Sequence, residues 1–230
     1  MKSPCQAHFE RETAKQQTTQ DSTANRANLN QQELMMAMLY EHRSRLKGIE
    51  SLQAKAALKV QLLPEYAPYV DGILAGNSGQ PDDVLMSVMV WRMDVNDWDG
   101  ALAIAQYALD HGLSLPDQYQ RSTACLIAEE VAECAIKSAK DDETQISLEV
   151  VERVQSMTID HDMPDQVRAK LFKAIGYLVE PTDPEQALVH LKTALKYHEK
   201  VGVKQDIKRI ESALKKQQQQ NTGDADNGST

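Results

Sequence analysis

Apolar residues recur at helical spacing from Met35 to Leu63, and this pattern constrains the fold more than any other feature. They fall on one face of a helix of about eight turns at 3.6 residues per turn. The stripe consists of Met35, Met38, Leu39, His42, Leu46, Ile49, Leu52, Ala56, Val60 and Leu63. We predict one long amphipathic helix over residues 30–63, stopped by Pro64, with Gly48 as the residue that indicates a break.

The remaining helical signals extend this pattern along the chain. Aromatic residues make up only 5% of the 230 residues, and strands depend on aromatic and β-branched side chains. Proline, glycine and aspartate separate the other apolar segments, as at helix starts and ends. They predict helices over residues 66–75, 81–95, 98–111, 122–140, 144–157, 165–179, 184–199 and 203–216. We therefore predict an all-α chain, in which the long N-terminal helix precedes an array of helical hairpins.

The polar ends lack apolar periodicity and are predicted to be disordered. Four segments result. Residues 1–29 form a flexible N-terminal arm, and residues 30–63 form the long helix, for DNA contact, oligomerisation or both. Residues 64–216 form a helical core domain, and residues 217–230 form a disordered polar tail.

Charge is unevenly distributed in this acidic chain, whose formal net charge is −9. Residues 1–63 carry nine Lys and Arg against six Asp and Glu, whereas residues 64–200 carry eleven against twenty-four. An acidic protein binds nucleic acid only through a local basic face. The candidate regions are the N-terminal third and the last predicted helix. The predicted DNA-binding face lies on the N-terminal helix and consists of Arg43, Arg45, Lys47, Lys55 and Lys59. From the charges alone, a solvated helix face is the commoner interpretation.

The chain has no apolar run of the roughly 20 residues that cross a bilayer, and its first residues lack the apolar core of a signal peptide. Three cysteines without a Cys-x-x-Cys spacing are typical of free thiols in a reducing compartment. We therefore predict a protein of the cytoplasm.

Two segments of the chain echo each other. The segment from Asp97 to Leu109 aligns with the segment from Asp183 to Leu195, and both contain an initial Asp followed by two Ala-Leu pairs. The matches are similar to helical hairpins of the tetratricopeptide kind. Their offset of 86 residues is not a multiple of that family's 34-residue period. A tetratricopeptide-like adaptor that binds a protein partner therefore stays an alternative function, although the sequence does not contain the 34-residue repeat that would favour it.

Acidic residues gather between the predicted helices. Asp82, Asp83, Asp94, Asp97 and Asp99 are numerous enough to hold Mg²⁺ for phosphodiester cleavage. Aspartates at these positions are also natural helix caps, which is the commoner reason for such residues.

No other chemical motif stands out in the sequence. Asp160-His161-Asp162 and His42 lack a second histidine at ligand spacing, and His42 falls on an apolar stripe, which favours a core histidine. Trp91 and Trp98 occupy positions typical of packing, and the chain has no nucleotide-binding glycine loop. We assign no metal ligand and leave the catalytic residues unknown.

Two sequence blocks resemble a known family. The first contains Gln80 to Met86, Val90 to Asp94, Gly100 to Leu102 and Tyr107 to Leu109; the second runs from Asp162 to Leu171. With Ser3, Pro4, Gln6 and His8 they resemble the small subunit of the DNA-packaging terminase of tailed temperate bacteriophages of the enterobacterial myovirus type. The likeness extends from residue 3 to about residue 214 and rests on the order of the matches.

The resemblance implies a function. A terminase small subunit binds viral DNA at the packaging site and hands it to the large subunit at the procapsid, in the host cell cytoplasm. The implied partners are double-stranded phage DNA, the terminase large subunit and further copies of the chain. Oligomerisation is assigned to Met35, Met38, Leu39, Leu46, Ile49 and Leu52 of the apolar stripe. Some relatives end in a basic tail, whereas this chain ends in a run of glutamines and two aspartates.

The family is also labelled as the endonuclease subunit, which leaves an alternative open. The chain would then cleave DNA itself with Mg²⁺, although no nuclease or ATPase motif is found in the sequence. We expect no cofactor in this chain, with Mg²⁺ required only if it cleaves DNA.

Overall fold

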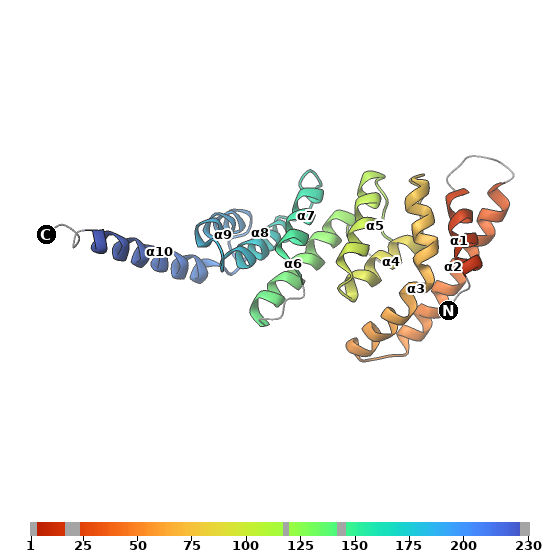
Figure 1. The fold of residues 1–230 in the computed structure, drawn as a ribbon, viewed down its shortest axis with the longest axis horizontal. Coiled ribbons are helices and arrows are strands. Elements are labelled where there is room, and N and C mark those ends of the chain that lie inside the picture. The colour runs from red at the N-terminus through yellow and green to blue at the C-terminus, as the bar shows by residue number, and fades with distance from the viewer. Residues whose placement is uncertain (1–3, 17–23, 117–119, 142–145, 226–230) are drawn as a thin grey trace. The chain divides into compact units, whose positions relative to one another are not determined.

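The computed structural model of the protein describes residues 4–16, 24–116, 120–141 and 146–225. These residues form ten α-helices and contain no strand, which confirms the predicted all-α class. They divide into two compact units, residues 1–123 and residues 124–230 (Figure 1). None of the helices in the described ranges is long and apolar enough to span a membrane.

The first unit contains five helices: α1 (Pro4–Gln16), α2 (Ala24–Lys47), α3 (Leu52–Gly76), α4 (Asp83–Asp94) and α5 (Trp98–Asp110). Helix α3 contacts α1, α2 and α4, and α4 pairs with α5. Tyr66 and Tyr69 of α3 are fully buried, as are Leu85 and Met89 of α4. The core of this unit therefore lies around the middle of α3.

The helix predicted over residues 30–63 is divided into α2 and α3. This corrects the single long element, and the division lies at Gly48, the residue that indicated a break in the sequence. Helix α2 ends at Lys47, and the Gly48 amide bonds to the carbonyl oxygens of Ser44 and Arg45. Ser51 then caps α3, because its hydroxyl accepts a hydrogen bond from the Ala54 amide at 3.3 Å. A glycine with a serine cap three residues later ends one helix and starts the next.

Pro64 does not stop a helix, which is a second correction. Helix α3 continues through Pro64 and Pro68 to Gly76, the end predicted for the following helix. Each proline removes one backbone hydrogen bond. Burial of apolar side chains offsets this cost, because α3 buries Leu62, Leu63, Tyr66, Tyr69, Val70 and Ile73.

The predicted flexible arm is partly helical. Residues 4–16 form α1, which packs on α3 and carries an ion pair between Arg11 and Asp71 at 3.7 Å. Residues 24–29 belong to α2. Apolar periodicity is weak here, so helix formation depends on contacts that the sequence pattern does not reveal. The rest of the arm, residues 1–3 and 17–23, lies outside the described residues.

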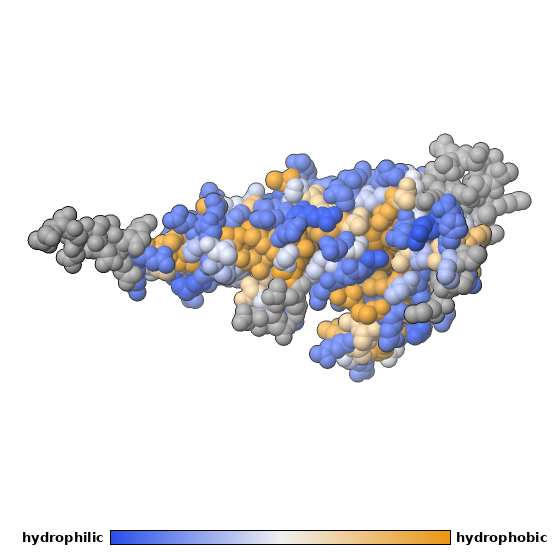
Figure 2. Space-filling model, in the orientation of Figure 1, coloured by the Kyte–Doolittle hydropathy of each residue, from blue (hydrophilic) through white to orange (hydrophobic). Residues whose placement is uncertain are grey.

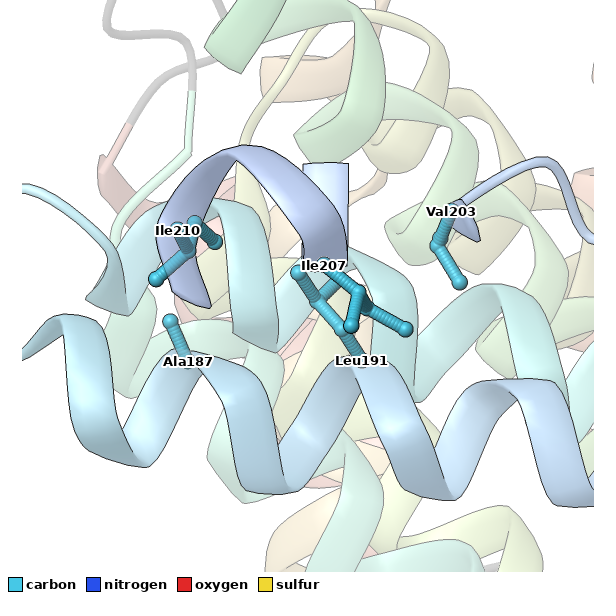
Figure 3. Packing of buried hydrophobic residues seen from close by; sticks show 5 residues of the cluster. All are labelled: Ala187, Leu191, Val203, Ile207 and Ile210. Atoms are coloured by element: carbon cyan, nitrogen blue, oxygen red, sulfur yellow. The ribbon is translucent and has the colours of Figure 1, made fainter. Parts of the chain in front are cut away.

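The second unit contains α6 (Thr123–Asp141), which begins at its boundary, α7 (Leu148–Thr158), α8 (Asp165–Val179), α9 (Pro184–Tyr197) and α10 (Lys204–Ala225). Helix α8 has the predicted bounds, and α9 packs against both α8 and α10. Figure 3 shows side chains of α9 facing those at the start of α10. This cluster consists of Ala187, Leu191, Val203, Ile207 and Ile210.

The last helix is longer than predicted. Helix α10 continues through Gln217–Gln220 to Ala225, into the segment predicted as a disordered tail from residue 217. Glutamine has a high helix propensity, so a polar run can prolong a helix that tertiary packing has already nucleated. Residues 226–230 lie outside the described part of the chain.

The two similar segments, residues 97–109 and 183–195, each begin at the N-cap of a helix, α5 and α9. Asp97 caps α5 by accepting from the Gly100 amide at 3.1 Å, and Asp183 caps α9 by accepting from the Gln186 amide at 2.9 Å. The repeated alanines, Ala101, Ala108, Ala187 and Ala194, are all fully buried. Small side chains at these buried positions allow neighbouring helices to approach closely.

Candidate functional site

The five predicted DNA-contacting residues lie on α2 and α3, near the corner where these helices meet. Two of them bind α4. Arg43 donates from Nη2 to Ser87 Oγ at 2.6 Å, and Lys59 forms an ion pair with Asp94. Ser87 in turn donates to the Asp83 carbonyl oxygen at 2.5 Å. Arg43 and Lys59 therefore help to hold α4 against α2 and α3.

The other three basic residues leave charge at the surface. Arg45 and Lys47 are exposed in the last turn of α2, and Lys55 is half-buried in the first turns of α3. None of the three forms an ion pair with another residue that the structure describes. Cations at a helix C-terminus are favoured by the helix dipole. The structure thus places Arg45 and Lys47 where an anion can reach them.

The predicted oligomerisation residues divide into two groups. Met35, Leu39 and Leu46 are buried within the chain, at 1%, 0% and 7% exposure. Met38 and Ile49 are half-buried, whereas Leu52 is 80% exposed. Figure 2 shows hydrophobic surface at the corner between α2 and α3. One half of the stripe therefore serves the core of the first unit, and its end at the corner remains accessible.

His42 is part of this core, as predicted. Its Nδ1 lies 2.9 Å from the Tyr66 hydroxyl, and its ring meets the Tyr66 ring edge-on. Tyr66 also meets Trp91 edge-on, with ring centroids 5.8 Å apart. Burial lowers the pKa of His42, which favours the neutral ring. These three rings connect α2, α3 and α4.

Asp82 belongs to the interior of the first unit and caps α4. Its Oδ1 accepts from the Leu85 amide at 2.8 Å, and its Oδ2 accepts from the Tyr69 hydroxyl at 2.5 Å. Helix α4 begins at Asp83, two residues after the Pro81 start predicted from the sequence, because Asp82 takes the cap position. Burial raises the pKa of Asp82, and the hydrogen bonds from Tyr69 and the backbone oppose that rise.

The other acidic residues also have structural partners or lie in solvent. Asp97 accepts from Arg92 Nη1 at 2.8 Å, and this guanidinium passes so close to Gly100 that a Cβ there would overlap it. Asp99 is exposed. Within the part of the chain that the structure describes, no three acidic, histidine or cysteine side chains are grouped to hold a metal ion.

The Asp160-His161-Asp162 segment is a turn before α8. Arg168 binds it through the backbone, donating from Nη2 to the His161 carbonyl oxygen at 2.8 Å and from Nη1 to the Ile159 carbonyl oxygen at 3.2 Å. These contacts give the segment a structural role in the second unit.

Sequence reasoning missed a basic pocket in the second unit. It lies between α6, α8 and the segment that follows α9, and its volume is about 450 Å³. Five lysines line it: Lys137, Lys140, Lys170, Lys173 and Lys200. The available signal was spacing, because Lys137 and Lys140, like Lys170 and Lys173, are three residues apart on one helix and share a face.

Comparison with known proteins assigns the chain to a family. A family model described as the phage small terminase subunit matches residues 36–166, more than half of the chain. The terminase endonuclease subunit of Escherichia phage P2 is 39% identical over 216 residues, covering 94% of this chain and 87% of the relative. A probable terminase endonuclease subunit of Haemophilus phage HP1 is 27% identical over 79 residues, or 34% of this chain and 28% of the relative. No solved structure matches. The chain belongs to the phage small terminase subunit family and so serves the packaging of phage DNA.

Proposed function

We propose that this protein binds viral DNA at the packaging site and hands it to the terminase large subunit, which cuts the DNA and packages it into the capsid. The observation that carries the proposal is the similarity to a phage P2 terminase subunit over 94% of the chain. The partners are then double-stranded phage DNA, the large subunit and further copies of this chain. The process takes place in the host cell cytoplasm, at the procapsid.

The corner between α2 and α3 is the proposed DNA contact in the first unit. Arg45 and Lys47 are exposed there, with Lys55 close along the chain. Lysine and arginine bind backbone phosphates and release counterions, which makes the binding dependent on salt. Arg43 and Lys59 bind Ser87 and Asp94 of α4, and these contacts hold α2 and α3 in place beside this surface.

A double substitution tests the DNA contact. Arg45→Gln with Lys47→Gln is expected to weaken duplex binding about tenfold at 0.1 M salt and to reduce the slope of log K against log salt by about two. Fluorescence anisotropy over a salt series measures both quantities. The control is Lys196→Gln with Lys208→Gln, which removes the same charge from exposed positions of the second unit. Equal losses in both variants would refute the assignment.

The corner also offers an apolar contact for assembly of the subunit. Leu52 is 80% exposed and Val60 is 57% exposed, with Ile49 half-buried nearby in the chain. Monomeric proteins keep exposed apolar patches small, and helix faces of this kind commonly pack on another helix. The buried part of the stripe, Met35, Leu39 and Leu46, supports the fold on which this contact depends.

Leu52→Asp is expected to dissociate the oligomer, because a carboxylate would be buried in the contact between copies. The exposed Leu52 side chain adds little to the core, and an acid in the first turn of α3 suits the helix dipole. Light scattering on the purified chain measures the mass. Val189→Asp, at a 55% exposed position of α9, is the control. A Leu52→Asp protein that keeps the wild-type mass contradicts this contact.

Cleavage of DNA by this chain alone is the second candidate function. The name of the phage P2 relative, an endonuclease subunit, favours it. Against it, Asp82 is occupied in capping α4 and in binding Tyr69. Incubating the purified chain with duplex DNA, with and without Mg²⁺, separates the two functions. Salt-sensitive binding without cleavage supports a recognition subunit, whereas cleavage that requires Mg²⁺ moves catalysis into this chain.

A further inference from the structure

The basic pocket of the second unit concentrates positive charge in an acidic part of the chain. Ten of the described residues line it, among them five lysines, His198 and a single acid, Glu133. Residues 64–200 as a whole carry eleven Lys and Arg against twenty-four Asp and Glu. Like charges held close together raise the free energy of the folded state unless an anion lies among them.

Of the five lysines, Lys170 is the one that forms an ion pair with carboxylates of the described residues. Lys170 bonds to Glu133 at 2.6 Å and to Glu129 at 3.2 Å. The remaining four, Lys137, Lys140, Lys173 and Lys200, form no ion pair within the described ranges. The side chains of Lys137, Lys140 and Lys200 lie at exposed positions, where they can turn toward a ligand.

Lys173 is fixed in the wall of the pocket. Its Nζ donates to the Val201 carbonyl oxygen at 2.8 Å and lies 5.5 Å from the centre of the Tyr177 ring. Burial lowers the pKa of Lys173, the charge of Lys140 lowers it further, and the charge of Asp206 opposes both effects. The next residue after Val201 is Gly202, with a left-handed φ of 81° that other residues rarely adopt. A glycine turn thus shapes the segment that positions this ammonium group.

The chemistry of the lining favours a multiply charged anion. Lysine binds phosphate as a point charge, and several lysines converging on one cavity match the two or more charges of phosphate groups better than a single carboxylate. The described lining contains no arginine to grip a carboxylate through two parallel bonds. Ile136 and Val201 add apolar wall beside the charges.

We propose that the pocket between α6, α8 and the residues after α9 binds phosphate groups, through Lys137, Lys140, Lys173 and Lys200. The source is either the backbone of DNA or a free polyphosphate such as that of a nucleotide, because both present adjacent phosphates. The pocket belongs to the second unit, whereas the corner between α2 and α3 belongs to the first. Phosphate binding in the pocket does not require that DNA is bound at the corner.

The probe is inorganic pyrophosphate, titrated into the full chain by calorimetry at low salt. Saturable binding is expected in the wild type, and about tenfold weaker binding is expected in the double variant Lys140→Gln with Lys200→Gln. Both side chains are exposed and form no hydrogen bond with the described residues, so the variant should fold normally. Lys208→Gln with Lys196→Gln removes the same charge outside the pocket and should bind as the wild type does.

Duplex DNA forms the second arm of the experiment. If the pocket holds the DNA backbone, pyrophosphate displaces a labelled duplex and the pocket variant binds that duplex more weakly. If it holds a free polyphosphate, duplex affinity is unchanged and nucleoside triphosphates compete with pyrophosphate. The proposal is overturned if pyrophosphate does not saturate, or if pocket and control variants lose affinity equally. Pyrophosphate binding in a chain that does not bind DNA would refute the proposed function alone.

Discussion

Leu191→Ala is expected to lower the free energy of unfolding of the second unit by about 3 kcal/mol, the usual cost of a cavity left by a buried leucine. Leu191 is fully buried in the cluster of α9 and α10 (Figure 3). It also packs directly over Gly176 of α8, where an added Cβ would lie only 2.7 Å from the Leu191 Cδ2. One side chain therefore joins three helices, and its loss leaves space that α8 and α10 cannot fill without shifting.

Hydrogen exchange of the α8, α9 and α10 amides measures this effect, with faster exchange expected in the variant. Tryptophan fluorescence does not report on this effect. Both tryptophans, Trp91 and Trp98, lie in the first unit, so their fluorescence follows the unfolding of that unit in urea. Val189→Ala is the matched control, because Val189 is on the same helix and 55% exposed. A loss below about 1 kcal/mol for Leu191→Ala would show that the three helices close around the missing group.

Asp82→Ala is expected to destabilise the first unit by about 3 kcal/mol. About 1 kcal/mol comes from the lost helix cap, and the remainder comes from the Tyr69 hydroxyl, which is left buried without its acceptor. Tryptophan fluorescence during unfolding in urea measures the change, because Trp91 lies on the same helix. Asp83→Ala is the control, since Asp83 is exposed in the first turn and its effect should stay below about 1 kcal/mol.

Asp82→Asn separates the structural role from a catalytic one. The amide oxygen can still accept from the Leu85 amide, and the amide NH2 group can donate to the Tyr69 hydroxyl oxygen, so most of the stability should be kept. A neutral amide is a weaker ligand for Mg²⁺ than a negatively charged carboxylate. If the chain cleaves DNA and Asp82→Asn abolishes cleavage while the fold is kept, Asp82 is catalytic. If Asp82 only caps α4, we expect Asp82→Asn to leave both DNA binding and any DNA cleavage unchanged.

Local sequence chemistry determined the fold class and several helix boundaries. Asp97 and Asp183 mark helix starts because their side chains bond to amides three residues ahead. The start of α8 is predicted from Asp162 and Pro164, and Pro164 is the residue before the helix in the structure, without a side-chain cap. The family could also be inferred from the ordered blocks between Gln80 and Leu171, and the similarity to the phage P2 subunit supports that inference.

Tertiary packing decided what local signals left open. A continuous apolar stripe is compatible with one helix or two, and Ser51 with Gly48 favours two once Leu39 and Leu62 can both be buried in one core. A proline ends a helix only when its lost hydrogen bond outweighs the burial that follows, and around Pro64 it does not. The pocket lysines come from three segments between residues 137 and 200. Spacing within a helix reveals which side chains share a face, but only the packing of those helices brings the faces together, because burial is a property of the whole unit.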